Sequence, residues 1–187
     1  MSGPVTILGG GVMGLCAATE LSARGVPVTI VDPAGDAPGP HGCSWWAGGM
    51  LAPECEGETA EEPVTRLGRA AADWWAAQGV TVHCNGSLVV TLDRDRGELA
   101  RFARRTEGHR TLDQAALTAL EPDLDRFDTA LFFETEAHLT PRDALTRLRA
   151  LLRDRGAVFV TTPPTMARRW STAPALRRAV HWTTCAG

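Results

Sequence analysis

Lysine and tyrosine are absent from the 187 residues, and all 19 basic residues are arginine. The net charge is -3, so the chain lacks the positive excess that is typical of nucleic-acid-binding proteins. No apolar stretch approaches the roughly 18 residues of a membrane helix, and no positively charged segment precedes the first apolar stretch. We therefore expect neither a membrane protein nor a signal peptide.

The five cysteines are odd in number, scattered, and form no C-x-x-C pair. This pattern argues against a disulfide framework and against a zinc site, and it favours a reducing, cytoplasmic environment. His41, Cys43 and Cys55 lie in loops without the spacing of metal ligands, so no metal is expected. Hydrophobic residues make up 44% and charged residues 22%, which is an ordinary globular balance.

The first 32 residues have the pattern of a βαβ unit. An apolar, β-rich run over residues 5–8 leads directly into Gly9-Gly10-Gly11-Val12-Met13-Gly14, which fits G-x-G-x-x-G. Helical spacing follows over residues 12–24, and Gly25 favours the end of that helix. A second β-rich run over 26–31 ends at Asp32. The unit is predicted to be parallel and right-handed.

This glycine pattern, placed between a strand and a helix, predicts a dinucleotide site. Gly9 permits a tight turn, Gly11 lets a diphosphate approach the backbone, and Gly14 lets the helix pack close to the strand. The helix N-terminus offers N–H groups and a partial positive charge to the phosphates. Asp32 is in position for the hydroxyls of an adenosine ribose without a 2′-phosphate. These residues do not distinguish FAD from NAD.

The rest of the chain alternates helical and β-rich segments. We predict helices over 64–78, 99–105, 115–120 and from Thr140-Pro141 to Gly156, and strands over 129–133 and 157–160. Residues 80–84 and 87–92 are predicted to form a hairpin, because Asn85-Gly86 suits a type I′ turn. The arginines between Arg142 and Arg155 are expected on a solvated helix face.

Several segments together resemble one enzyme family. They are Ile7-Leu8-Gly9-Gly10-Gly11-Val12-Met13-Gly14-Leu15, Ser44-Trp45-Trp46-Ala47-Gly48-Gly49-Met50-Leu51-Ala52-Pro53, Gly86-Ser87-Leu88-Val89-Val90, Leu120-Glu121-Pro122 and Leu139-Thr140-Pro141-Arg142-Asp143-Ala144-Leu145. Over about residues 4–161 the chain resembles the FAD-dependent glycine oxidases of thiamine biosynthesis, within the D-amino-acid oxidase family. The Gly-Met-Leu-Ala-Pro segment is the more specific match, since many flavoproteins share the glycine motif.

The resemblance implies FAD bound in an extended form across a parallel sheet. The diphosphate would face Gly9, Gly11, Val12, Met13 and Gly14, the adenosine ribose would meet Asp32 and Pro33, and the phosphate, ribityl and flavin would be lined by Cys43, Ser44, Gly48, Gly49 and Met50. Two departures are visible. Asp32 stands where many members carry the longer Glu, and Trp45-Trp46 replace small residues.

The resemblance also implies an α/β fold with a discontinuous domain. A Rossmann-type FAD-binding domain would cover 1–78 and 139–165, with part of an α+β substrate domain inserted at 79–138. The family transfers hydride from the α-carbon of glycine or a small amino acid to the flavin, which O2 reoxidises to give H2O2. The reaction gives an imine or 2-oxo acid and would feed thiazole synthesis for thiamine, and homo-oligomers are possible in the full-length family.

The family's substrate clamp, an Arg and a Tyr, comes from its later half. That C-terminal half is expected to be missing here, so no catalytic residue is assigned, and the chain alone is expected to be truncated and inactive. Two other interpretations stay open: a non-catalytic dinucleotide-binding module, and another FAD- or NAD-dependent oxidoreductase that shares only the glycine turn.

Composition changes after Thr165. Residues 166–187 carry four arginines and no acidic residue, whereas all 22 acidic residues precede them. We interpret this tail as translated out of frame, with a genuine disordered basic tail as the alternative. Reading one base earlier allows an apolar strand that enters T-G-x-x-A, which resembles the family's next strand and glycine turn.

Overall fold

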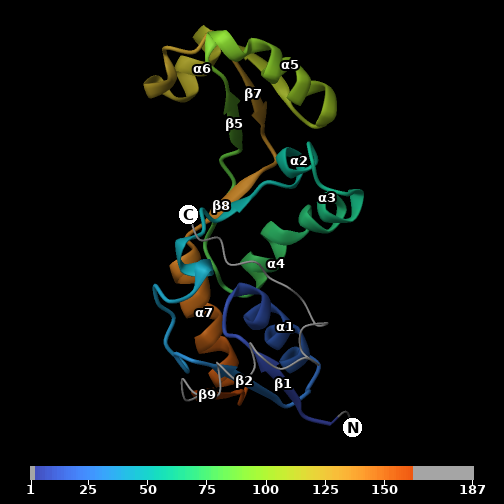
Figure 1. Ribbon diagram of the computed structural model, residues 1–187, viewed down its shortest axis with the longest axis vertical. Coiled ribbons are helices and arrows are strands. Elements are labelled where there is room, and N and C mark those ends of the chain that lie inside the picture. The colour runs from blue at the N-terminus through green and yellow to red at the C-terminus, as the bar shows by residue number, and fades with distance from the viewer. Residues whose placement is uncertain (1–2, 162–187) are drawn as a thin grey trace, which may run out of the picture. The chain divides into compact units, whose positions relative to one another are not determined.

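The computed structural model describes residues 3–161, without the side chains of residues 93 and 96. The segment 166–187, and with it the out-of-frame interpretation, lies outside these residues. Within these residues the chain forms two units, one of residues 3–47 and 145–161, the other of residues 48–144. Figure 1 labels most of the helices and strands. No helix between residues 3 and 161 is long and apolar enough to cross a membrane.

Helices and strands are interspersed along the chain. The helices are α1 (Val12–Ala23), α2 (Pro53–Glu56), α3 (Glu62–Gly68), α4 (Ala71–Ala77), α5 (Arg96–Arg105), α6 (Gln114–Leu120) and α7 (Pro141–Asp154). The strands are β1 (Val5–Leu8), β2 (Val28–Asp32), β3 (Met50–Leu51), β4 (Val82–His83), β5 (Ser87–Val90), β6 (Arg110–Asp113), β7 (Thr129–Phe133), β8 (Ala137–Leu139) and β9 (Val158–Thr161). A 3-10 turn, η1, covers Cys43–Trp46.

The first unit is built on a parallel sheet of order β1-β2-β9, which confirms the predicted βαβ start. Leu8 lies opposite Val31 in the register, so the loops after β1 and β2 emerge side by side. Helices α1 and α7 lie next to each other (Figure 1), and Arg155 Nη1 donates to Thr19 O at 3.1 Å. Both helices end as predicted, with Gly25 and Gly156 at positive φ.

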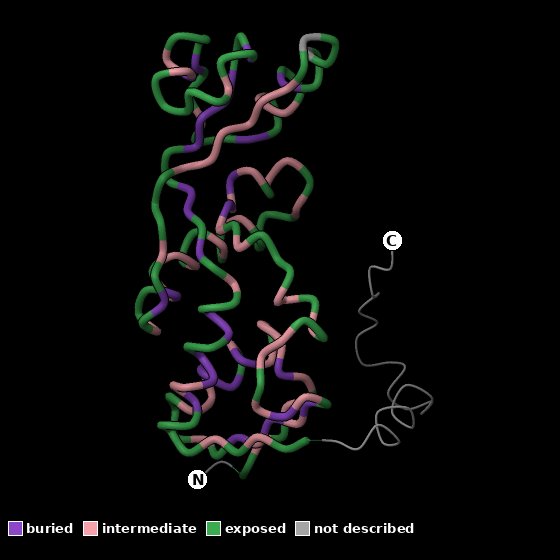
Figure 2. Tube along the Cα trace, turned by 90° about the vertical axis from the view of Figure 1, so that its left-hand side faces the viewer, coloured by how far each residue is buried: buried purple, intermediate pink, exposed green. Residues whose placement is uncertain are grey.

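The core of the first unit comes from β2 and from one stripe of each helix. Its fully or nearly buried apolar residues are Leu15, Ala18, Val28, Ile30, Leu145, Leu148 and Leu152. The edge strands keep apolar residues in solvent, since Leu8, Val158 and Val160 are all exposed. Figure 2 shows that buried positions occur in both units.

The second unit has two antiparallel sheets, β3-β8-β4 and β5-β7-β6. Strand β7 is apolar on both faces, because alternate side chains of a strand point in opposite directions. Ala130 and Phe132 belong to the cluster that includes Leu117 of α6, and Leu131 and Phe133 to the cluster that includes Leu99 of α5. The sheet is therefore covered by a helix on each side (Figure 1).

The predicted hairpin at Asn85-Gly86 is wrong. Strand β4 pairs with β8 and strand β5 pairs with β7, so the two strands belong to different sheets and never face each other. Gly86 does have a positive φ of 77°. Its N–H donates to Glu136 O at 3.0 Å, and a Cβ there would lie 2.5 Å from the Phe132 ring. The absence of a side chain at Gly86 therefore lets the chain pass close to β7, and the glycine does not form a hairpin turn.

The predicted helix over 64–78 is two helices. Helix α3 ends at Gly68 and α4 begins at Ala71. The break lies beside α2, where a Cβ on Gly68 would come 2.9 Å from Pro53 Cβ. Arg69, at the break, binds the Glu54 carboxylate with two donors, at 2.6 and 3.1 Å. Contacts between distant segments thus override the helical pattern.

The division into units differs from the domain boundaries that the sequence suggests. Residues 48–78 group with the second unit, although the prediction assigns them to the first segment of the FAD domain. The sequence predicts that the chain returns to the first unit near residue 139, whereas in the structure it returns at residue 145. The domain boundaries themselves stay a prediction.

Replacement of Gly86 by Ala should lower the free energy of unfolding by about 3 kcal/mol, because it combines a positive φ with overlap against the Phe132 ring. Gly97→Ala in α5 is the matched control. No atom lies within 4 Å of a Cβ there, and alanine favours a helix, so a gain of about 0.5–1 kcal/mol is expected. Urea denaturation measures both. Equal midpoints for the two variants would contradict the close packing at Gly86.

Candidate functional site

The glycine turn after β1 has the geometry that the motif predicts. Gly9 has φ 102°, a backbone conformation that residues other than glycine rarely adopt. A Cβ on Gly14 would lie 2.0 Å from Gly9 O and 3.2 Å from Ile7 Cγ2. The third glycine is therefore required for α1 to approach the strand.

The N-terminus of α1 is open to an anion. Its first turn contains no acidic residue, and its first N–H groups have no acceptor within the helix. The Val12 N–H donates to Ser44 Oγ at 3.1 Å, so η1 is fastened to the start of α1. A Cβ on Gly11 would lie 3.2 Å from the same oxygen. Ser44, a predicted cofactor residue, thus lies beside the glycine turn.

Asp32 ends β2 and holds the glycine turn directly. Its carboxylate accepts from Gly10 N at 2.7 Å and from Ala34 N at 2.9 Å. His41 Nε2 lies 3.8 Å from the same carboxylate. Each carboxylate oxygen can accept a second hydrogen bond. The side chain is therefore fixed in place and retains the capacity to bind a ribose hydroxyl.

Arg149 is the functional candidate that the sequence analysis missed. The prediction of a solvated arginine face on α7 is wrong at this position, where only 2% of the residue is exposed. Its Nη2 donates to Gly10 O at 2.7 Å and its Nη1 to Gly35 O at 3.0 Å. A signal was available: residue 149 follows Leu145 by four and precedes Leu152 by three, which places it in the buried stripe of the helix.

These groups line one crevice in the first unit. It is formed by Gly10, Gly11, Asp32, Pro38, Gly39, His41, Gly42, Ser44, Trp45, Leu145 and Arg149. A glycine turn without side chains, an anion-accepting helix end and a ribose-binding carboxylate fit the adenosine diphosphate half of a dinucleotide. Trp45, one of the departures from the resembling family, lines this crevice, whereas Trp46 is exposed and donates to Pro40 O at 3.0 Å.

The other predicted cofactor residues are distributed differently. Met13, Pro33 and Cys43 are exposed on the first unit. Gly48, Gly49 and Met50 belong to the second unit. There, Gly49 has a positive φ and a Cβ on it would lie 2.0 Å from Leu139 O, while Met50 is exposed on β3.

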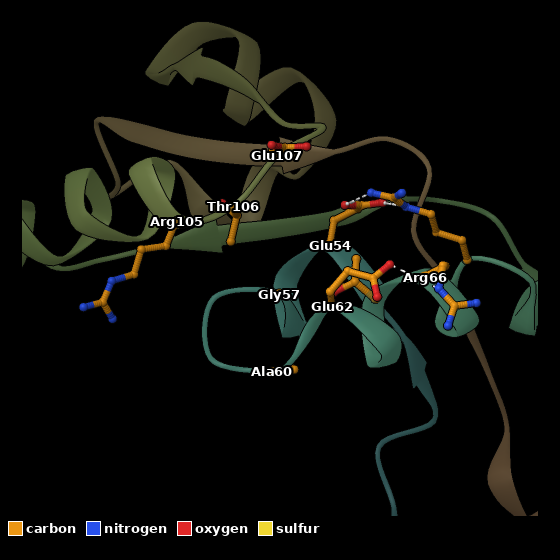
Figure 3. A pocket seen from close by; sticks show the side chains of 10 residues that line it. Glu54, Gly57, Ala60, Glu62, Arg66, Arg105, Thr106 and Glu107 are labelled. Carbon is orange, nitrogen blue, oxygen red and sulfur yellow. Dashed lines mark hydrogen bonds and ion pairs between the residues drawn. The ribbon is translucent and has the colours of Figure 1, made fainter.

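A second pocket lies in the second unit, between α2, α3 and the end of α5 (Figure 3). Its arginines are engaged with carboxylates: Arg69 with Glu54, Arg66 with Glu62 at 3.1 Å, and Arg105 with Glu58 at 2.9 Å. None of the predicted cofactor residues lines it. Its charges are internally compensated, so it does not have the character of an anion site.

Comparison with known proteins agrees with this geometry. Residues 4–179 match the family described as FAD dependent oxidoreductase, DAO. The chain belongs to this family. FAD is the cofactor of the family. The family match therefore confirms the predicted resemblance and the predicted cofactor.

Members and structural neighbours cover this chain well. A Rhizobium etli protein, provisionally named thiamine biosynthesis oxidoreductase ThiO, is 55% identical over 152 residues, 80% of this chain and 46% of that protein. Glycine oxidase from Bacillus cereus has a TM-score of 0.68 at 20% identity, covering 84% of this chain and 46% of that one. L-α-glycerophosphate oxidase from Mycoplasma pneumoniae, with FAD bound, has a TM-score of 0.67 at 19% identity and covers 84% and 44%.

These structural likenesses confirm the predicted α/β fold class. The chain spans about half the length of the proteins that it matches. The fold of the FAD-dependent oxidoreductases is thus present over about half of their length.

Gly11→Ala should separate cofactor binding from folding. Its Cβ would lie 3.2 Å from Ser44 Oγ, a tight contact that a small shift of this side chain relieves, so we expect a loss of about 1 kcal/mol in stability. The methyl group would block the approach of a diphosphate and weaken ADP binding by at least about tenfold. Gly14→Ala is the contrast: its overlap with Gly9 O should cost about 3 kcal/mol. Calorimetric titration and urea denaturation measure both effects, and wild-type ADP affinity in Gly11→Ala would show that the turn serves backbone geometry only.

Cysteine labelling should report occupancy of the crevice. Burial raises the pKa of the Cys16 thiol to about 11, which leaves roughly 0.3% thiolate at pH 8.5. Burial and the neighbouring Glu136 carboxylate also raise the pKa of Cys55. Iodoacetamide should therefore modify the exposed Cys43 and Cys84 first.

ADP should then slow the modification of Cys43, which precedes Ser44, and leave that of Cys84 unchanged. Peptide mapping by mass spectrometry at timed intervals resolves each site, and labelling in urea provides the unprotected rates. Equal protection of both cysteines, or of neither, would contradict nucleotide binding at η1.

Proposed function

We propose that this chain forms the FAD-binding part of an oxidase for glycine or another small amino acid. The reaction would convert the amine and O2 to an imine and H2O2, and water would then hydrolyse the imine to a 2-oxo acid and ammonia. The product would supply thiazole synthesis for thiamine. The observation that carries the proposal is the crevice of Gly10, Asp32 and Ser44 within a chain that is 55% identical to the Rhizobium etli ThiO protein.

The residues of the first unit would bind the adenosine half of the cofactor. Diphosphate oxygens would accept hydrogen bonds from the backbone of Gly11 and from the first turn of α1, where no carboxylate competes. Asp32 would accept a hydrogen bond from the ribose, while its bond from Gly10 N keeps the glycine turn in place. Ser44, held at the start of α1, would contact the phosphates.

The residues around Gly48, Gly49 and Met50 would line the flavin. Gly49 is held close to the backbone of β8, since its carbonyl accepts from Leu139 N at 2.9 Å. When bound, the flavin supplies the chemistry by accepting hydride from the substrate α-carbon and passing the electrons to O2. The contribution of this chain is to bind and orient, and none of its residues is assigned a proton-transfer role.

FAD should bind to the purified chain, because the glycine turn, the start of α1 and the Asp32 carboxylate suit its adenosine diphosphate half. Titration followed by flavin fluorescence measures the affinity, and NAD titrated in parallel tests the alternative dinucleotide. Asp32→Asn retains an acceptor oxygen but loses the charge, so it should weaken FAD binding by about tenfold. Uptake of NAD in preference to FAD would contradict the cofactor assignment.

The amino-acid reaction is tested in a chimaera. Residues 1–161 of this chain replace the corresponding segment of the Rhizobium etli protein, whose remaining sequence supplies the rest of the enzyme. We expect glycine-dependent release of H2O2, measured with a coupled peroxidase, and its loss when Gly11→Ala is introduced. A chimaera that binds FAD and oxidises no small amino acid would contradict the proposed reaction and leave the cofactor assignment intact.

A further inference from the structure

We propose that Arg149 is a positioning residue for the adenosine half of the cofactor, because it ties the glycine turn after β1 to the turn after β2. This inference rests on the proposed function, since the crevice between these turns is where the cofactor is proposed to bind.

The two turns are joined through one side chain. Arg149 donates from Nη2 to Gly10 O and from Nη1 to Gly35 O, and the two acceptors lie 25 residues apart in sequence. Asp32 holds the other side of both turns, since its carboxylate accepts from Gly10 N and its carbonyl accepts from Gly35 N at 2.9 Å. The peptide groups at Gly10 and Gly35 are therefore each held from two directions.

Gly10 is the residue that admits this arrangement. It occupies a variable position of the G-x-G-x-x-G motif, yet a Cβ there would lie 2.6 Å from Arg149 Nη2 and 3.2 Å from Asp32 Oδ2. The absence of a side chain at position 10 leaves room for the guanidinium. Gly10 and Arg149 thus form a matched pair that the motif alone does not require.

Burial of the charged Arg149 side chain costs free energy that an apolar side chain filling the same space would not cost. It is buried with its Nε unpartnered, and burial lowers its pKa. A buried ionised group seldom stabilises a fold better than an apolar residue of similar size, and leucines occupy the neighbouring buried positions of α7. The guanidinium instead offers two donors in a rigid fork, which neither Leu nor Lys can provide.

The surrounding charges favour an anionic ligand in the crevice. Asp32 and Asp36 attract the guanidinium, with Asp36 Oδ1 at 3.9 Å from Nη1, while Arg153 repels it and pairs with Asp36. Arg149 thereby offsets the negative charge of Asp32 on the wall of the crevice. A diphosphate that enters beside that carboxylate meets less repulsion than it would from Asp32 alone.

The experiment compares Arg149→Met and Arg149→Lys with Arg155→Met in the full chain. Arg155 also donates to a backbone carbonyl, that of Thr19, but it is exposed and its hydrogen bonds go to Thr19 O and Ser22 Oγ, so it controls for the loss of an arginine-to-carbonyl bond away from both turns. The first measurement is amide hydrogen exchange at Gly10 and Gly35 in the ligand-free protein. The second is ADP affinity by calorimetry, and the thermal midpoint of each variant records global stability.

Arg149→Met should accelerate exchange at Gly10 and Gly35 by at least tenfold and weaken ADP binding by at least tenfold. Arg149→Lys, which keeps the charge but reaches one carbonyl, should fall between Arg149→Met and wild type. Arg155→Met, which removes an exposed side chain, should change the thermal midpoint little and change ADP affinity by less than twofold. If Arg149→Met does not fold, Arg149→Lys takes its place in the comparison. A loss of exchange protection and of ADP affinity in Arg149→Lys then supports the proposal, and wild-type values contradict it.

Wild-type exchange rates at both glycines in the Arg149 variants would overturn the proposal, as would full recovery of exchange protection and ADP affinity by Arg149→Lys. Equal losses of ADP affinity in Arg149→Met and Arg155→Met would reduce the residue to a structural role and also overturn it. If the wild-type chain binds neither ADP nor FAD, the proposed function fails, whereas hydrogen exchange still decides whether Arg149 positions the turns.

Discussion

The hydrogen bond from Gly10 N to the Asp32 carboxylate is the interaction on which the candidate site depends. It closes a loop between the ends of two parallel strands, because the register of β1 against β2 brings Gly9 N within 2.8 Å of Val31 O. Once the strands pair in this register, the turns that follow them must lie side by side. The crevice at their carboxyl ends is therefore a consequence of strand pairing, as in other open α/β sheets.

Close approach of backbone to backbone is the second constraint. Gly14 lets α1 approach Gly9, and Gly10 lets a guanidinium occupy the space where a side chain would otherwise project. The same principle acts in the second unit, where Gly49 passes Leu139 and Gly86 passes Phe132. Glycine is used at these positions for packing distance, and at Gly49 and Gly86 a positive φ is required as well.

Prediction from sequence succeeded where the interactions are local. The βαβ start, the helix from Pro141 and the helix ends at Gly25 and Gly156 depend on propensity, periodicity and caps, which neighbouring residues supply. Prediction failed at Asn85-Gly86 because a turn dipeptide does not say which strand its neighbours pair with. Arg149 was misjudged because its residue type suggests solvent, although its position in the helical stripe indicates burial.

The sequence by itself determined the parallel start of the sheet, the glycine turn and the family, since these follow from short patterns whose physical requirements are met by adjacent residues. Only the tertiary structure decided that Ser44 lies at the start of α1, that Gly10 is held from both sides, and that α7 contributes a buried arginine. Those contacts join residues 22 to 139 positions apart, and the partner of a buried polar group over such separations is set by how the elements pack.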